Sequence, residues 1–145
     1  MLDYMLNIGS KAPDFSALDQ NGKKHRLADY QGRYLLLYFY PKDDTPGCTK
    51  EACAFRDSYQ DLHKVRTEVL GVSKDSVESH GKFARKFGLP FPILSDSSRE
   101  IISAYGVTGR QSFLISPAGT IVKIYNKVKP AGHAMEVIAD LEGLG

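Results

Sequence analysis

The sequence predicts an α/β fold in which helices flank a mixed central sheet, and three observations support this prediction. Short apolar strands alternate with amphipathic helices along most of the chain, which is typical of a mainly parallel sheet covered on both faces. The dipeptide Asn21-Gly22 lies between two short alternating stretches and indicates an N-terminal β-hairpin. A Ser-Pro-Ala-Gly turn at residues 116–119 joins two further strands, which must therefore be antiparallel.

Length and composition indicate a single domain spanning residues 1–145. The 145 residues are 42% hydrophobic and 25% charged, as in an ordinary globular domain. Neither a repeat nor a low-complexity tract divides the chain. Its 19 Lys and Arg against 17 Asp and Glu leave a net charge of +2, which is too small to indicate binding to nucleic acid or to an anionic membrane.

The sequence also lacks targeting and membrane signals. The first residues have neither the basic cluster nor the long apolar stretch of a secretory signal. The longest apolar run, residues 34–40, has seven residues, whereas a membrane-crossing helix needs about 20. We therefore expect a soluble, cytoplasmic protein with no membrane partner.

The first half of the chain is expected to form a hairpin, a central strand and a long helix. Residues 14–27 surround the Asn-Gly turn and form the hairpin. Residues 34–39 (YLLLYF) are a continuous apolar run, so we expect this strand to be central and buried on both faces. Residues 46–65 are expected to form one amphipathic helix, because apolar side chains recur there at helical spacing. These side chains are Ala52, Phe55, Tyr59 and Leu62.

The second half continues the alternation of strands and helices. Residues 67–73 are expected to form a buried strand. Residues 76–87 are expected to form a helix, with Ser76 as its N-cap and Gly88 directly after its end. The remaining elements are a strand at 91–95, a short helix at 98–105, strands at 112–115 and 120–125, and a closing helix at 132–141.

The residues that favour chemistry gather around Cys48. Residues 40–53 follow the expected central strand and open the next helix, and active sites of open α/β sheets lie at the carboxyl ends of strands. Thr45 suits the N-cap and Pro46 the first helical position, which places Cys48 in the first turn. The positive end of a helix stabilises a thiolate there. The alternative is that the cap is only structural and Cys48 is a small apolar filler.

Cys53 follows Cys48 by five residues in the same expected helix. Helix geometry separates positions i and i+5 by about 8.6 Å between Cα atoms. A disulfide tolerates at most about 7 Å, so the two sulfurs can bond only if the turn between them unwinds. This spacing favours a transient catalytic disulfide over a permanent one, and the alternative is that Cys53 is a buried helix residue beside Ala52.

We expect no metal site. A zinc site needs about four ligands at characteristic short spacings. The histidines instead occur singly, which favours solvated or capping roles, and none is an obvious partner for a cysteine-protease dyad. They are His25, His63, His80 and His133.

The segment from Pro41 to Glu51 resembles the Pro-x-x-x-Thr-x-x-Cys signature of peroxiredoxins. Cys53 is similar to the resolving cysteine of the bacterioferritin-comigratory, or peroxiredoxin Q, subfamily. Residues 9–15 are similar to the entry segment of the family and residues 105–115 to its arginine-bearing strand, so the resemblance covers nearly the whole chain.

This resemblance implies a thioredoxin-like fold and a thiol peroxidase that reduces hydrogen peroxide and organic hydroperoxides. It implies no cofactor, a monomer, and thioredoxin as the dithiol that resets the enzyme. The Cys-x-x-Cys motif of thioredoxins is absent, which disfavours a plain disulfide reductase. The alternative function is a thioredoxin-fold binding or chaperone-like module with regulatory cysteines.

The resemblance also implies a role for each site residue. Cys48 attacks the peroxide and becomes a sulfenic acid, which Cys53 resolves as a disulfide. Arg110 stabilises the thiolate and orients the peroxide, and Thr45 supplies a hydrogen-bond donor. Pro41, which has no N–H, covers the thiolate. The alternatives are a solvated loop arginine at Arg110 and simple strand termination at Pro41.

Overall fold

The structure is a computed structural model that describes residues 6–144. Residues 1–5 and 145 of the expected domain lie outside this range. The described chain forms a seven-stranded sheet in the order β2-β1-β5-β4-β3-β6-β7. The strands are β1 (Ser16–Leu18), β2 (Lys24–Arg26), β3 (Tyr34–Phe39), β4 (Thr67–Ser73), β5 (Ile93–Ser95), β6 (Gln111–Ile115) and β7 (Ile121–Tyr125). The helices are the 3-10 helix η1 (Leu27–Tyr30), α1 (Pro46–Asp57), α2 (Tyr59–Lys64), α3 (Val77–Phe87), α4 (Glu100–Ala104) and α5 (His133–Leu144).

The mixed sheet is confirmed, but the expectation that it is mainly parallel is wrong. Only β3 with β4 and β4 with β5 pair in parallel. The predicted hairpin β1–β2 and the pair β6–β7 are antiparallel, as expected from their tight turns. In addition, β6 runs antiparallel to β3, and β1 runs antiparallel to β5. The strand β3 is interior as expected, although β4 is the middle strand of the sheet.

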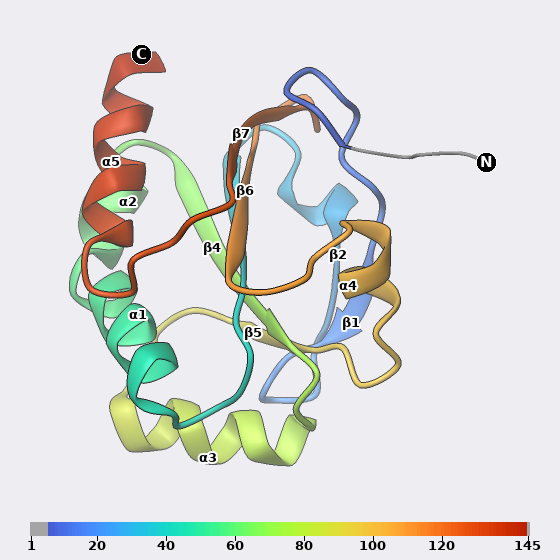
Figure 1. Ribbon diagram of the computed structural model, residues 1–145, viewed down its shortest axis with the longest axis vertical. Coiled ribbons are helices and arrows are strands. Elements are labelled where there is room, and N and C mark those ends of the chain that lie inside the picture. The colour runs from blue at the N-terminus through green and yellow to red at the C-terminus, as the bar shows by residue number, and fades with distance from the viewer. Residues whose placement is uncertain (1–5, 145) are drawn as a thin grey trace.

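The strand β3 separates two apolar cores, because successive side chains of a strand point to opposite faces. Leu36 and Tyr38 pack with α1, α3 and α5 on one face. Leu35, Leu37 and Phe39 pack on the other face with α4 and η1. Figure 1 shows α1, α2 and α5 together on one side of the sheet and α4 on the opposite side. Burial on both faces explains why this segment is a continuous apolar run.

Helix boundaries follow local signals in α3 but not after α1. The side chain of Ser76 accepts a hydrogen bond from the backbone N–H of Ser79 at 3.1 Å, and Gly88 ends α3 with a φ of 61°. Both predictions are confirmed. The single helix expected over residues 46–65 is instead divided at Ser58, where φ is −101° and ψ is 5°. Serine is a poor residue for a helix interior because its hydroxyl competes for backbone hydrogen bonds.

None of the described helices is long and apolar enough to cross a membrane.

Gly71 of β4 is closely packed between side chains of the two neighbouring strands. It pairs with Tyr38 on one side and with Ile93 on the other. A Cβ atom at this position would lie 2.9 Å from Ile93 Cγ2 and 3.0 Å from Tyr38 Cζ. The absence of a side chain therefore lets the Tyr38 ring lie across the strand.

We predict that Gly71→Ala lowers the free energy of unfolding by about 1–3 kcal/mol, the usual cost of overpacking a core. Chemical denaturation measures this loss. Gly132→Ala is the matched control, because a Cβ atom there meets nothing within 4 Å. Equal stability of the two variants would contradict the close packing of Tyr38 on Gly71.

Candidate active site

Cys48 is the third residue of α1, in the first turn that follows β3, as the sequence predicts. Only 1% of its surface is exposed. Thr45 takes the N-cap position with extended backbone, but its side chain does not cap the helix. Its hydroxyl donates instead to the carbonyl of Lys42 at 2.9 Å. The side chain of Thr45 therefore occupies none of the N–H groups of the first turn.

Arg110 reaches Cys48 from a distant part of the sequence. Its Nη2 lies 3.4 Å from Cys48 Sγ, and its Nη1 lies 2.7 Å from Oε1 of Glu51. Antiparallel pairing of β3 and β6, with Phe39 opposite Gln111, places the start of β6 beside the end of β3. A parallel β6 would have carried Arg110 to the other end of the sheet.

Gly47 allows this approach of the guanidinium to the helix. A Cβ atom at Gly47 would lie 3.0 Å from Arg110 Nη2 and 3.7 Å from Pro130 Cγ. A larger residue would therefore push Arg110 away from the sulfur of Cys48. Pro130, in the loop before α5, lies next to the same position.

Arg110 is a cation in this position. Burial alone would lower its pKa, but the hydrogen bonds to Cys48 and Glu51 outweigh burial and raise the pKa above its usual value. The guanidinium therefore places a positive charge 3.4 Å from Cys48 Sγ.

Glu51 is a site residue that the sequence prediction missed. It lies one helical turn after Cys48 and is fully buried, with 0% of its surface exposed. Burial raises its pKa to about 7, although the hydrogen bond and charge of Arg110 act in the opposite direction. Its Oε2 has no hydrogen-bond partner among the described residues. The available signal was the i, i+3 spacing from Cys48, which places a carboxylate on the same helix face.

Cys53 lies in α1 together with Cys48, and both are free thiols. The side chain of Cys53 is half-buried. Because the helix is continuous from Pro46 to Asp57, its geometry holds the two residues about 8.6 Å apart between Cα atoms. A disulfide between them requires α1 to unwind.

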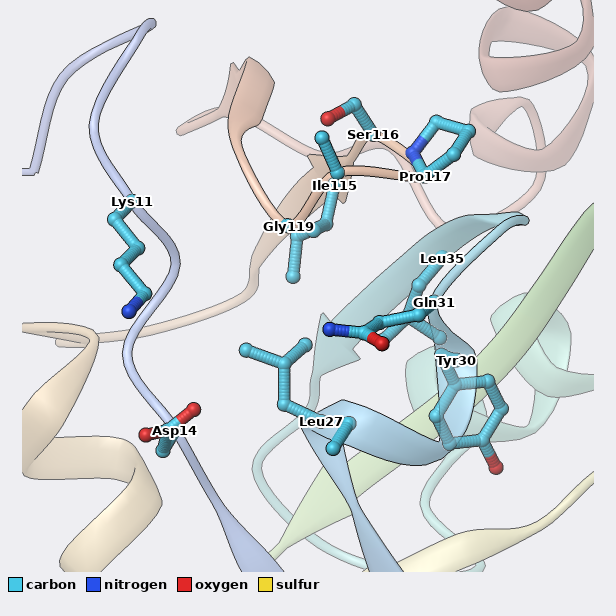
Figure 2. Close-up of a pocket in the computed structure, with 12 residues that line it drawn as sticks. Lys11, Asp14, Leu27, Tyr30, Gln31, Leu35, Ile115, Ser116, Pro117 and Gly119 are labelled. Carbon is cyan, nitrogen blue, oxygen red and sulfur yellow. The ribbon is translucent and has the colours of Figure 1, made fainter.

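Pro41 is exposed and borders a cavity of about 500 Å³ at the carboxyl end of β3. Val107, Thr108 and Gly109, which directly precede Arg110, line the same cavity. A smaller cavity of about 130 Å³, shown in Figure 2, lies where β3 begins and β6 ends, and Leu35 and Ile115 line it. None of the predicted site residues lines the smaller cavity.

The prediction that the histidines are solvated or capping is wrong for three of the four. His25, His80 and His133 are buried, and both ring nitrogens of each have hydrogen-bond partners. His63 alone keeps an exposed ring. His80 and His133 reach partners in distant segments, which a single sequence does not reveal, whereas both partners of His25 lie within six residues of it.

One group of described residues could hold a metal ion, although the sequence indicated none. Asp43, Asp75 and His80 each offer a ligand atom, and these atoms lie within 4.8 Å of one another. Asp43 lies on the loop before α1, five residues before Cys48, and His80 and Asp75 lie on α3 and in the segment that precedes it.

Known proteins resemble this chain in sequence and in fold. The AhpC/TSA family model matches residues 8–124. A relative from Coxiella burnetii, named putative peroxiredoxin bcp, is 44% identical and is aligned over 94% of this chain and 99% of its own. A Cys-to-Ser mutant of Xylella fastidiosa PrxQ has a TM-score of 0.94 at 34% identity, covering 98% of this chain and 99% of that chain.

A further solved structure is that of the bacterioferritin comigratory protein of Xanthomonas campestris, studied for its alkyl peroxide reduction activity. It has a TM-score of 0.89 at 35% identity and covers 98% of this chain and 99% of that chain. The present chain therefore belongs to the AhpC/TSA family, in its Bcp and peroxiredoxin Q branch. It is a peroxiredoxin with a thioredoxin-like fold, an oxidoreductase that reduces peroxide at the expense of a thiol.

We predict that wild-type protein loses stability relative to Glu51→Gln as pH rises from about 4.5 to about 7. In this range the unfolded chain has released the Glu51 proton whereas the folded state keeps it, so this stabilisation is complete below about pH 4.5 and is lost by about pH 7. The difference should be a few kcal/mol at most, at roughly 1.4 kcal/mol per pKa unit.

Denaturation between pH 4 and 8.5 measures this difference. The control is Glu78→Gln, which neutralises a carboxylate whose side chain is 82% exposed. Parallel stability profiles for wild type and Glu51→Gln would show that folding does not raise the pKa of Glu51, contrary to the effect of its burial.

Proposed function

We propose that Cys48 is the peroxidatic cysteine, that Cys53 resolves it, and that Arg110, Thr45 and Pro41 complete the peroxide site. The observation that carries the proposal is the contact of 3.4 Å between Arg110 Nη2 and a cysteine sulfur in the first turn of a helix. Two independent sources of positive charge, the guanidinium and the helix N-terminus, meet at this buried sulfur.

The first half-reaction is a displacement at oxygen. The Cys48 thiolate attacks the terminal oxygen of the hydroperoxide, an S–O bond forms and the O–O bond breaks. The sulfur is oxidised to a sulfenic acid, and the leaving alkoxide takes a proton to become an alcohol, or water when the substrate is hydrogen peroxide. Negative charge moves from sulfur to the leaving oxygen, and Arg110 with the first-turn N–H groups stabilises it.

Thr45 acts on the peroxide as a hydrogen-bond acceptor rather than as the donor inferred from the sequence. Its hydroxyl proton is directed to the carbonyl of Lys42. The lone pairs of Oγ1 are then free to receive the O–H of the hydroperoxide, which fixes the direction of attack. Pro41 offers no N–H to compete for the substrate, and its ring limits access to the cavity beside it.

The second half-reaction forms a disulfide. The Cys53 thiol attacks the sulfur of the Cys48 sulfenic acid, an S–S bond forms, and water leaves with the proton of the thiol. An external dithiol of the thioredoxin class then reduces this disulfide and is itself oxidised. Both cysteines belong to one chain, so a monomeric, single-domain enzyme is sufficient. The cytoplasm supplies such dithiols, and we place the enzyme there.

We predict that Cys48→Ser abolishes peroxide reduction, whereas Cys53→Ser consumes about one equivalent and then stops. The difference arises because the first variant lacks the nucleophile and the second lacks only the resolving thiol. Stopped-flow loss of hydrogen peroxide measures both, and dimedone traps the sulfenic acid that accumulates in Cys53→Ser.

Wild-type protein with thioredoxin and its reductase is the reference for complete turnover. Equal single-turnover activity in the two variants would overturn the assignment of roles. Undiminished turnover of Cys53→Ser with thioredoxin would leave Cys48 as the catalytic cysteine and remove Cys53 from the cycle.

We predict that oxidation of the two cysteines lowers the thermal stability of the protein. The disulfide closes a loop of six residues, which removes only about 2 kcal/mol of unfolded-state entropy. Unwinding the first part of α1 releases several backbone hydrogen bonds, each worth about 1 kcal/mol, and disturbs the packing of Phe55, which is 0% exposed.

Thermal melts of reduced and oxidised protein, with hydrogen exchange over residues 46–60, measure the change. Cys53→Ser treated with one equivalent of peroxide is the control, because it is oxidised but forms no internal disulfide. A higher melting temperature of the oxidised form, with equal protection of these amides, would mean that α1 survives disulfide formation.

A further inference from the structure

Asp43 anchors the loop between β3 and α1, which carries Pro41 and Thr45. Its carboxylate accepts a hydrogen bond from the Tyr40 hydroxyl at 2.6 Å. Oδ2 accepts another from Ser79 at 2.8 Å and meets Nδ1 of His80 at 2.7 Å. The chemistry of the cysteines uses none of these contacts. The loop between β3 and α1 is thus fastened to α3 through one buried carboxylate.

Two further contacts fasten the same loop to this side of the molecule. The backbone N–H of Asp43 donates to Asp75, which precedes α3, at 2.8 Å. Asp44 has a left-handed backbone with a φ of 57°, and its carboxylate receives Lys86 of α3 at 2.8 Å. Figure 1 shows α3 at the end of the sheet where the chain passes from β3 into α1.

Both ring nitrogens of His80 have hydrogen-bond partners. The Nε2 atom lies 2.9 Å from the carbonyl oxygen of Leu94, which can only accept, so Nε2 carries a proton. The Nδ1 atom lies 2.7 Å from Oδ2 of Asp43. Burial would raise the pKa of Asp43, but hydrogen bonds from His80 and Tyr40 outweigh burial and lower it.

Two carboxylates, a backbone carbonyl and an aromatic ring surround His80. Asp43 faces it from the loop, and Asp75 places an oxygen within 4.8 Å in the segment before α3. The Leu94 carbonyl faces it from β5, and the Tyr40 ring lies 6.3 Å away, centroid to centroid. The His80 side chain itself is 0% exposed. Removing the His80 ring would leave the buried acceptors of Asp43 and Leu94 with one partner fewer, which is unfavourable.

We propose that His80 is a positioning residue of the peroxidase, whose side chain holds Asp43 and thereby the loop that presents Pro41 and Thr45 to the peroxide. This inference rests on the proposed function of Cys48. In this proposal α3, which contributes no reacting group, fixes the loop between β3 and α1, which binds the peroxide. Arg110 and the helix N-terminus, which stabilise the thiolate itself, are held by other contacts.

The same three side chains could in principle bind a divalent metal ion, and the contacts disfavour that occupant. Both ring nitrogens of His80 already have hydrogen-bond partners, and Oδ2 of Asp75 already accepts from Ser73 at 2.8 Å and from the Asp43 backbone. A metal ion held by these three side chains would have to break the contact between His80 Nδ1 and Asp43 and the hydrogen bonds that Asp75 accepts. Metal binding is therefore an alternative that the experiment tests.

A second buried histidine–aspartate pair is a matched control for His80 and Asp43. His25 is also buried, and its Nε2 lies 2.7 Å from Oδ2 of Asp19. This second pair holds the β1–β2 hairpin and does not contact the loop before α1. Substituting His25 removes a buried histidine–aspartate pair of equal length without disturbing the peroxide site.

The experiment compares His80→Gln, Asp43→Asn and the control His25→Gln as reduced proteins. Two rate constants are measured for Cys48 in each: reaction with hydrogen peroxide, and alkylation by iodoacetamide, which needs the thiolate but not an oriented peroxide. We expect the ratio of the two to fall at least about tenfold in the first two variants, since misplacing a reacting group by about 1 Å can cost on the order of a hundredfold. The ratio in His25→Gln should stay at the wild-type value.

An unchanged ratio in folded His80→Gln and Asp43→Asn would overturn the proposal, as would an equal fall in His25→Gln. If these variants do not fold, the His80 ring in wild-type protein decides: long-range ¹H–¹⁵N spectra should show Nδ1 in a hydrogen bond with Asp43, and an Nδ1 without this hydrogen bond contradicts the proposal. A peroxide rate that changes with EDTA or added Zn²⁺ would assign the group to a metal. Wild-type Cys48 that reacts with peroxide no faster than a free thiol would instead contradict the proposed function itself.

Discussion

The proposed chemistry depends on the compensation of one charge, that of the thiolate of Cys48, a residue with only 1% of its surface exposed. A buried anion is unfavourable unless it is paired and hydrogen-bonded. Arg110 supplies the opposite charge, and Glu51 on the same helix face as Cys48 holds the second nitrogen of its guanidinium. Gly47 leaves the space in which the guanidinium lies. Cys48, Arg110 and Glu51 form a compact unit, so that replacing any one of the three changes the surroundings of the other two.

The topology of the sheet makes this unit possible. Antiparallel pairing with β3 starts β6 at the end of the sheet where α1 begins, and this brings Arg110 within reach of Cys48 from 62 residues away. The double-sided burial of β3 then fixes that end of the sheet, since Tyr38 and Phe39 pack into opposite cores and are at most 1% exposed. The same apolar run that determines the fold therefore also determines where the helix with the cysteine starts.

Features that depend on neighbouring residues were predictable from the sequence, and those that depend on distant partners were not. The cap at Ser76, the glycine after α3 and the helical position of Cys48 follow local rules and are confirmed. Glu51 and His80 are charged or polar residues whose burial depends on Arg110 and Asp43, which lie far away in the sequence. Single-sequence patterns do not contain such pairings, nor the direction in which β6 enters the sheet.

In the proposed cycle, the loop before α1 stays fixed while α1 itself moves. The proposed disulfide requires α1 to unwind around Cys48, because helix geometry keeps Cys53 about 8.6 Å away between Cα atoms. The loop before α1 is held through Asp43 by groups of α3 and β5, which do not belong to this helix. Unwinding that begins at Pro46 would therefore not release the loop. We propose that the helix refolds against this anchored loop once the disulfide is reduced, which returns its N-terminus and Cys48 to the position that peroxide reduction requires.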